Sequence, residues 1–333
     1  MDAFAVIIPT HAPRRPWLIE AVSSALASPG CRRVIVIDDG SPTPVPGDWF
    51  ENLGGDSEAN ITLARQMNAG PSAARNRGIE IAFEAPDAPP WLVFLDDDDA
   101  LLPDGPQAMI QQCERLGAVA CVAGRYEVQA DGVERQHPPP AAYSGGVIPG
   151  PGEVFRPIAI FGGSGMLVRA EALRPSTGAR TGPARETPRF DESLVIGEDR
   201  DMLRRLAAIG PVAVCGVPAL RVRIHASAAN LTSPARYERR IRDHAQLVAK
   251  WCDAASGAHF RQATRWLAGA AAKASVSDEA WRTLTSVCES RGWSMPIKAR
   301  ARRALASWFG ARAKGASLAA VNAEQAGPGF DVR

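Results

Sequence analysis

Short apolar runs alternate with helical patterns along the first part of the chain, and this alternation restricts the fold more than any other feature. The runs FAVIIP (residues 4–9) and RVIVID (residues 33–38) are rich in β-branched residues and end at polar or turn residues. Between them, apolar residues recur at helical spacing until a Pro-Gly pair at 29–30. The pattern continues with a strand, a helix and a strand, expected at 60–64, 72–85 and 91–95. Such alternation predicts an α/β fold with a mostly parallel central sheet.

The later part of the chain follows other patterns. Residues 125–160 contain HPPPAAYSGGVIPGPGE, whose many Pro and Gly residues predict a surface loop, and a second loop is expected at 176–189. From about residue 234 onward only helical patterns occur, at 234–252, 258–274, 278–290 and 296–314. The expected organisation is an α/β domain, a helical C-terminal region and a disordered tail, with bounds 1–232, 233–315 and 316–333.

Composition excludes several classes of protein. With 46% hydrophobic and 22% charged residues the chain is typical of a soluble globular protein, and its formal charge of +2 gives no support for nucleic-acid binding. Charge is nevertheless divided, because residues 233–333 hold 17 Lys and Arg against 8 Asp and Glu. The six cysteines form no metal-binding or disulfide pattern, and no signal peptide or membrane-spanning run is recognised. These features predict a cytoplasmic protein.

Two acidic clusters follow directly after predicted strands. Asp38 and Asp39 come after the run at 33–38, and Asp96 to Asp99 come after the run at 91–95. In open α/β sheets the carboxyl ends of the strands face the ligand, so both clusters are expected at one crevice. Oxygen ligands suit a hard cation such as Mg²⁺ or Mn²⁺. The alternative is a solvated acidic turn without a ligand.

Three further features accompany these clusters. The stretch NAGPSAARNRGI (residues 68–79) places small residues and Arg75 at the start of a helix, an arrangement that favours anions such as a diphosphate. The pair Glu198-Asp199 stands where another helix begins and can also simply complement the helix dipole. His225 follows a strand-like run and is either structural or a ligand.

Taken in order, these motifs resemble glycosyltransferase family 2, the inverting enzymes of the GT-A fold. The resemblance extends over roughly residues 4–228 and rests on VIIPTHAPRRPWLIEAVSSAL, VIVIDDGSP, NAGPSAARNRGI, VFLDDDDALLP and GEDRDMLRRLAAIG. It implies a GT-A (nucleotide-diphospho-sugar transferase, Rossmann-like) fold with a mostly parallel sheet, followed by a helical C-terminal extension. It also implies a metal-dependent transfer of a sugar from a nucleotide-sugar donor.

The resemblance assigns several residues to the nucleotide pocket. Pro9, Thr10 and Asp39 match positions that line this pocket, with Asp39 as the expected partner of the base. Arg75 and Asn76 match the Ala-Arg-Asn element beside the nucleotide.

Other matching positions concern the metal and the reaction. Asp96 and Asp98 match the outer positions of the DxD motif, which binds the donor ribose, the diphosphate and a divalent metal. Asp98 is the expected direct ligand of Mn²⁺ or Mg²⁺, with Asp99 supporting the site. Asp199 matches the general base, and His225 matches a histidine that in some relatives approaches the metal or diphosphate.

The sequence also departs from the family pattern. Thr10-His11-Ala12 stands where relatives often have an aromatic residue or Asn, so the residue that stacks on the base is open. Asp97 stands where small residues are common, and its role is open too. The stretch GGSGM (residues 162–166) suits either a close approach of an acceptor or a plain turn.

The expected function is inverting transfer of a sugar from a nucleotide sugar, with a UDP-sugar favoured, to a carbohydrate or lipid-linked acceptor in polysaccharide or glycoconjugate synthesis. A carboxylate-based glycoside hydrolase and a catalytically silent nucleotide-sugar-binding module are the alternatives. Residues 295–314 combine basic residues with an apolar helical face of Ile297, Ala301, Leu305, Trp308 and Phe309. This segment either packs on the protein or makes a peripheral contact with the inner face of an anionic membrane.

Overall fold

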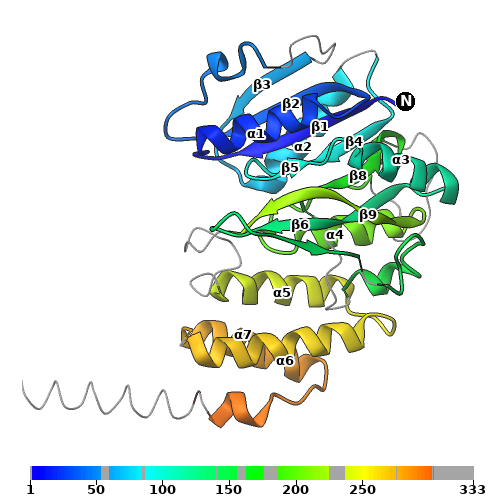
Figure 1. Ribbon diagram of the computed structural model, residues 1–333. Coiled ribbons are helices and arrows are strands. Elements are labelled where there is room, and N and C mark those ends of the chain that lie inside the picture. The colour runs from blue at the N-terminus through cyan, green and yellow to red at the C-terminus, as the bar shows by residue number, and fades with distance from the viewer. Residues whose placement is uncertain are drawn as a thin grey trace, which may run out of the picture.

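The structure is a computed structural model of the 333-residue chain (Figure 1). It describes residues 2–53, 60–84, 87–139, 141–155, 163–175, 187–224, 237–274, 276–301 and 303.

A single curved sheet forms the centre of the α/β part. Its order is β3-β2-β1-β4-β8-β6-β9-β5, with β7 paired to β6. The strands are β1 (Phe4–Thr10), β2 (Cys31–Asp39), β3 (Asn60–Gln66), β4 (Trp91–Phe94), β5 (Ala100–Leu101), β6 (Ala120–Val128), β7 (Glu134–His137), β8 (Met166–Arg169) and β9 (Val212–Arg223). The pairings make β1, β2, β3, β4, β6 and β9 run in one direction, while β5, β7 and β8 run against them.

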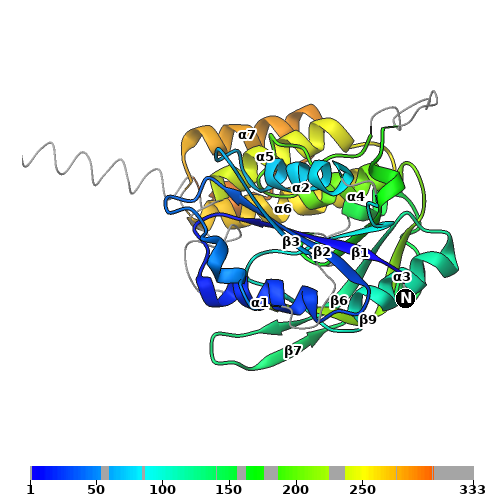
Figure 2. The same ribbon diagram turned by 90° about the horizontal axis from the view of Figure 1, so that it is seen from above.

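Helices cover both faces of this sheet, as Figure 2 shows. On one face lie α1 (Arg15–Leu26) and α3 (Gly105–Leu116), and on the other lie α2 (Pro71–Glu84) and α4 (Glu198–Ala207). Successive strand side chains point to opposite faces, so Val6 packs with α1 while Ile7 packs with α2. Burial on both faces explains why these strands are continuous apolar runs in the sequence.

One glycine sets how closely α2 approaches the sheet. A Cβ atom at Gly78 would lie 2.3 Å from Cγ2 of Ile7 on β1. Any side chain there would push the helix outward, and with it Arg75, which lies one turn earlier on α2.

The central part of the chain differs from its prediction. Residues 125–160 were expected to form a surface loop, but β6 continues to Val128 and forms an antiparallel hairpin with β7. A short 3-10 helix then follows at Pro151–Phe155. The loop prediction was therefore wrong for the strand residues. Pro and Gly mark only the turns of this region, and the backbone of the strand residues is hydrogen-bonded by strand pairing.

The C-terminal region is helical, as predicted. Helices α5 (Tyr237–Trp251), α6 (Gly257–Ala274) and α7 (Asp278–Ser290) pack together on the side of the sheet that carries α2 and α4 (Figures 1 and 2). The predicted boundary between 232 and 233 and the predicted tail at 316–333 lie outside the described residues. No helix in the described ranges has the length and apolar character needed to cross a membrane.

Helix α5 is fastened to the start of α4. The carboxylate of Asp243 accepts hydrogen bonds from the backbone N–H groups of Val195 (3.1 Å) and Ile196 (2.9 Å), directly before α4. Near the C-terminal end of α5, Lys250 Nζ lies 2.6 Å from Oδ1 of the fully buried Asp201 on α4. The C-terminal helices therefore hold the segment that contains Glu198 and Asp199.

Candidate functional site

The predicted acidic clusters lie at one edge of the sheet. Strands β1, β2 and β4 are parallel neighbours, so Thr10, Asp39 and the residues after Phe94 all come at their carboxyl ends. This is the edge where ligands bind in open α/β sheets. Pro9 lies within β1, buried opposite Ile37 of β2.

Asp39 holds the loop before α2. Its Oδ1 accepts hydrogen bonds from Gln66 Nε2 (2.8 Å) and the Ala69 N–H (2.9 Å), and its Oδ2 accepts one from the Gly70 N–H (2.8 Å). Asp39 is 4% exposed. Asp39 therefore holds the loop before α2 in place, a role that the sequence did not indicate. Contact of Asp39 with a nucleobase stays a prediction.

A glycine permits this arrangement. Gly40 has φ +71°, and a Cβ atom there would lie 2.5 Å from the backbone nitrogen of Asn68. Next to it, Nδ1 of the exposed His11 lies 2.9 Å from the carbonyl oxygen of Asp39. The close approach of Gly40 to Asn68 places the end of β2 against the loop before α2, and the His11 contact joins the end of β1 to the end of β2.

Asp38 is a structural residue that the family pattern did not single out. It is 1% exposed and accepts hydrogen bonds from the N–H groups of Ser41 (2.8 Å) and Val45 (3.2 Å) and from Arg65 Nη1 (2.5 Å). Burial alone would raise the pKa of Asp38, but the hydrogen bonds of Ser41, Val45 and Arg65 hold it below its usual value.

The four aspartates after β4 have four different environments. Oδ1 of Asp96 lies 2.7 Å from Arg75 Nη2, and the Asp96 N–H donates to Ser164 Oγ at 3.1 Å. Ser164 belongs to the stretch GGSGM, and this hydrogen bond places Ser164 against the aspartate cluster. Asp97 accepts a hydrogen bond from the hydroxyl of Thr10, which gives this residue its structural role.

The remaining two aspartates contact the end of β9. Oδ1 of Asp99, which is 4% exposed, accepts the Arg223 N–H at 3.0 Å, and the carbonyl oxygen of Asp98 accepts from Arg223 Nε at 3.2 Å. Burial raises the pKa of Asp97 to about 7, and neighbouring aspartate charges add to this effect. Burial, followed by the charges of Asp96 and Asp98, also raises the pKa of Asp99 well above its usual value. Ionising Asp97 and Asp99 beside the other two carboxylates is therefore unfavourable.

Arg75 connects this cluster to the Glu-Asp pair. Its Nη2 binds Asp96, and its Nη1 lies 3.1 Å from Oε1 of Glu198 at the start of α4. The guanidinium is buried, and the charges of both carboxylates outweigh burial and raise its pKa above the usual value. Two sequence motifs far apart in the chain thus meet through one cation.

Asn76, its neighbour, makes structural contacts that the sequence did not indicate. Its Nδ2 donates to the Phe190 carbonyl oxygen (3.0 Å) and to Glu192 Oε1 (2.9 Å), and its Oδ1 accepts the Phe190 N–H (3.0 Å). The amide therefore clamps the segment before α4. A contact of Asn76 with the nucleotide stays a prediction.

The Glu-Asp pair opens α4 after Gly197. Glu198 is buried, and burial followed by the charge of Asp199 raises the pKa of Glu198 to about 7, although Arg75 opposes this effect. Asp199 is partly exposed, and its Oδ1 accepts the Arg200 N–H at 2.7 Å. Asp199 is thus the more exposed member of the pair.

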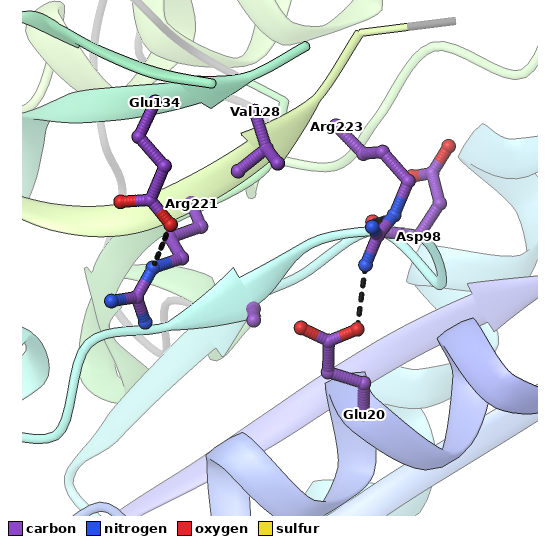
Figure 3. Close-up of a pocket in the computed structure, with 7 residues that line it drawn as sticks. Glu20, Asp98, Val128, Glu134, Arg221 and Arg223 are labelled. Carbon is purple, nitrogen blue, oxygen red and sulfur yellow. Dashed lines mark hydrogen bonds and ion pairs between the residues drawn. The ribbon is translucent and has the colours of Figure 1, made fainter. Parts of the chain in front are cut away.

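A cavity of about 250 Å³ opens beside Asp98 (Figure 3). Ion pairs flank it on two sides, with Arg223 Nη2 2.6 Å from Glu20 Oε2 and Arg221 Nε 2.9 Å from Glu134 Oε1. Ala100 and Val128 complete its lining. The cavity is polar and mixed in charge, so it suits a charged polar ligand better than an apolar one.

The aspartate cluster fits a hard divalent cation. Its donors are all oxygen atoms, and the raised pKa values of Asp97 and Asp99 show carboxylates that a cation would stabilise. Within the described ranges, no group of three or more metal-binding side chains is gathered at one point. A cation held by one or two carboxylates and by substrate phosphates agrees with this arrangement. His225, the second predicted ligand, lies outside the described residues.

Similarity to known proteins decides the family. The model of glycosyl transferase family 2 matches residues 5–175, about half of the chain. The chain belongs to glycosyl transferase family 2.

Two curated relatives of this family 2 member come from Rhizobium meliloti (strain 1021). Succinoglycan biosynthesis protein ExoO is 30% identical over 199 residues, which cover 58% of this chain and 52% of the relative. Succinoglycan biosynthesis protein ExoW is 35% identical over 105 residues, which cover 31% of this chain and 32% of the relative. The chain thus matches about half or less of the length of these relatives.

Solved structures share the fold. TarS from S. aureus is similar with a TM-score of 0.55 and 14% identity, covering 90% of this chain and 50% of TarS. TarS 1–349 in complex with UDP-GlcNAc gives a TM-score of 0.53 at 14% identity, covering 90% of this chain and 83% of that one. The similarity confirms the predicted fold, a GT-A sheet with a helical C-terminal part, for this family 2 member.

Proposed function

We propose that the protein is a metal-dependent, inverting glycosyltransferase. It transfers a sugar from a nucleoside diphosphate sugar, a UDP-sugar, to a carbohydrate or lipid-linked acceptor in the synthesis of a polysaccharide or glycoconjugate. The observation that carries this proposal is the position of Arg75 between Asp96 and Glu198, which joins the aspartate cluster to the Glu-Asp pair. Family membership, the names of the succinoglycan relatives and the UDP-GlcNAc complex of TarS support it.

Asp199 is the proposed general base. An acceptor hydroxyl is a weak nucleophile and needs a carboxylate to take its proton as the new bond forms. Asp199 is partly exposed, whereas Glu198 is buried against Arg75. The hydroxyl oxygen attacks the anomeric carbon, the bond from that carbon to the diphosphate oxygen breaks, and the proton moves to Asp199. A single displacement inverts the anomeric centre.

The aspartate cluster binds the donor in this proposal. Asp96 and Asp98 would hold Mn²⁺ or Mg²⁺ and the diphosphate, with Asp98 as the direct ligand, Asp99 in support and His225 as a further proposed ligand. When bound, the cation stabilises the negative charge of the departing nucleoside diphosphate. Arg75 keeps Asp96 oriented, and the Asp39 contacts keep the loop before α2 in place beside the nucleotide.

Residues 295–314 are the proposed membrane contact. Residues 297–301 and 303 are helical, and the rest of the predicted helix lies outside the described residues. Ile297 is 83% exposed and Ala301 is exposed, whereas Ala299 is 2% exposed. The start of the predicted apolar face is therefore not covered by the described part of the protein. Flotation with anionic vesicles, compared between the full chain and a chain lacking 295–333, tests this role, and equal flotation would contradict it.

Donor binding tests the main proposal directly. Thermal unfolding is measured with a series of nucleoside diphosphates, each with Mn²⁺, with Mg²⁺ or with a chelator. A ligand that binds only the folded state raises the midpoint by mass action, so UDP with metal should stabilise the protein and UDP with chelator should not. Absence of stabilisation by every nucleotide would contradict donor binding.

A pair of matched variants makes this test specific. Asp98→Asn should remove the metal-dependent stabilisation by UDP. Asp104→Asn is the control, because Asp104 is exposed and its side chain makes no capping hydrogen bond to α3. Equal responses of the two variants would contradict the assignment of Asp98.

A further inference from the structure

Arg223, at the end of β9, contacts the aspartate cluster with both its backbone and its side chain. Its N–H donates to Oδ1 of Asp99 at 3.0 Å, and its Nε donates to the carbonyl oxygen of Asp98 at 3.2 Å. The first contact holds a side chain, and the second holds the main chain. Because the second contact uses the carbonyl oxygen of Asp98, it does not compete with a cation for the carboxylate. One residue thus fixes two neighbouring aspartates relative to the sheet.

The guanidinium group of Arg223 also binds α1. Its Nη2 lies 2.6 Å from Oε2 of Glu20, and its Cζ lies 5.0 Å from the centre of the Trp17 ring. Residues three apart on a helix share a face, so Trp17 and Glu20 form one contact surface for the arginine. Figure 3 shows the Arg223 side chain extending past Asp98 toward Glu20. Helix α1 and the aspartate cluster are therefore joined through a single side chain.

The cavity beside Asp98 leaves this arginine incompletely packed. Arg223 lines the cavity of about 250 Å³, and its side chain is 24% exposed. An arginine side chain has several rotatable bonds, so an incompletely packed one needs directed contacts to stay in a single rotamer. Glu20 supplies a close, charge-assisted contact of this kind. The ion pair with Glu20 therefore orients the guanidinium that binds the carbonyl oxygen of Asp98.

Helix α1 also holds the chain just after the aspartate cluster. Oγ of Ser24 accepts the N–H of Leu101 at 3.0 Å. Ser24 lies one turn after Glu20, and residues four apart on a helix share a face. The face of α1 that carries Glu20 and Ser24 therefore supports this part of the chain at two points, once through Arg223 and once directly.

We propose that Arg223, oriented by Glu20, is a positioning residue for the cation site at Asp98 and Asp99. Residues that hold a metal ligand in place without touching the metal typically change metal affinity or activity by about 10–100-fold when they are replaced. Arg223 acts in this way through the main chain of Asp98 and the carboxylate of Asp99. The cation site itself belongs to the proposed function, on which this inference rests, whereas the ordering of the aspartate cluster by Arg223 does not depend on it.

Arg221 offers a matched control in the same cavity. It precedes Arg223 by two residues on β9, and its Nε lies 2.9 Å from Oε1 of Glu134 on β7. Arg221→Gln therefore removes an ion pair of the same kind from the same strand and the same cavity. The ion pair that it removes is with β7 and not with α1. Any effect of Arg223→Gln beyond that of Arg221→Gln therefore reports the contacts of Arg223 with the aspartate cluster and α1.

The dependence of UDP binding on Mn²⁺ tests the cation site. UDP is titrated calorimetrically into the full-length protein at a series of Mn²⁺ concentrations, which gives the concentration for half-maximal binding. Arg223→Gln should need about tenfold more Mn²⁺ than wild type, whereas Arg221→Gln should stay within about twofold of wild type. Arg223→Lys keeps the charge for Glu20 but loses the fork that reaches two acceptors, so its loss should be smaller. An arginine with a merely structural role would lower the unfolding midpoint and leave this Mn²⁺ concentration unchanged.

A double-mutant cycle tests whether Glu20 acts through Arg223. Glu20 is exposed, so Glu20→Gln should fold as wild type does. On its own it should raise the required Mn²⁺ concentration by about two- to fivefold, the range of an exposed ion pair. In the Arg223→Gln background it should have no further effect, because the arginine that it orients is absent. Additive effects of the two substitutions would overturn the linkage from α1 to the aspartate cluster.

Hydrogen exchange separates a failure of this inference from a failure of the proposed function. The peptide covering 96–102 is measured without nucleotide or metal. Within it, the N–H of Asp99 is bonded to the carbonyl oxygen of Asp96 at 3.2 Å and reports the order of the cluster. Exchange should be about tenfold faster in Arg223→Gln than in Arg221→Gln.

The outcomes are distinct. If wild type binds UDP with Mn²⁺ and both arginine variants need the same Mn²⁺ concentration, the inference is overturned. If wild type does not bind UDP with Mn²⁺, the proposed function is contradicted, and equal exchange in the two variants then overturns the inference as well.

Discussion

Arg75 on α2 and Glu198 at the start of α4 form a buried ion pair, with Nη1 3.1 Å from Oε1. The same guanidinium binds Asp96 at 2.7 Å, so one cation balances carboxylates from two different motifs. The contact is more than a stabilising feature, because it sets the position of α4 relative to the aspartate cluster. If Asp199 is the base, this contact determines how far the base lies from the donor.

Replacing Arg75 should therefore be costly. Arg75→Gln leaves two carboxylates without their cation, and loss of one partner from a buried pair destabilises by about 3–5 kcal/mol. Arg77→Gln is the control on the same helix, because Arg77 is 46% exposed and its ion pairs are on the surface. The free energy of unfolding of Arg77→Gln should lie within about 0.5 kcal/mol of the wild-type value. Chemical denaturation measures both, and equal costs would show that the Arg75 pair contributes no more than a surface pair.

Asp199→Asn should separate binding from reaction. The amide keeps the size of the side chain but cannot take a proton, so transfer to a proven acceptor should fall by about 10²–10⁴-fold. Stabilisation by UDP with Mn²⁺ should stay close to wild type, because the aspartate cluster is unchanged. Full transferase activity of Asp199→Asn would exclude this residue as the base.

Much of this arrangement could be predicted from the sequence because it depends on local patterns. The buried strands at 4–10 and 31–39 are continuous apolar runs, and the polar residues that follow them had to lie at the carboxyl edge of a parallel sheet. Asp39, Asp96 and Asp99 are found at that edge.

The rest depends on contacts between distant parts of the chain. Nothing in the sequence near Asp97 shows that its partner is the hydroxyl of Thr10, or that Asn76 points toward Phe190 while its neighbour Arg75 points toward Asp96. The hairpin of β6 and β7 was missed for a related reason, since β7 is the exposed segment ERQH without an apolar pattern. Its pairing, and not its composition, makes it a strand.

The raised pKa of Glu198 predicts an unusual dependence of stability on pH. In the folded state this pKa rises from 4.5 to about 7, so the folded protein binds more protons than the unfolded chain between these values. The free energy of unfolding of wild type, relative to Glu198→Gln, should therefore be highest below pH 4.5 and should fall as the pH rises through 7. The change is at most about 3 kcal/mol. Denaturation curves of both proteins across this range measure it, and parallel pH profiles would contradict the raised pKa of Glu198.

Asp243 should control the order of the segment before the Glu-Asp pair. Its carboxylate accepts the N–H groups of Val195 and Ile196 and also binds Arg239. Asp243→Asn weakens these charge-assisted hydrogen bonds, each worth about 1.5–3 kcal/mol, so local opening should become at least about tenfold more frequent.

Hydrogen exchange of the peptide covering 193–199 measures this opening. Asp253→Asn is the control, because Asp253 accepts the Ser256 N–H and, within the described ranges, has no hydrogen bond to that peptide. Faster exchange of the peptide in Asp243→Asn alone would show that α5 orders the start of α4. If the exchange of 193–199 were unchanged in Asp243→Asn, the segment would be held by Asn76 and Arg75 instead, and the C-terminal helices would have no part in positioning Asp199.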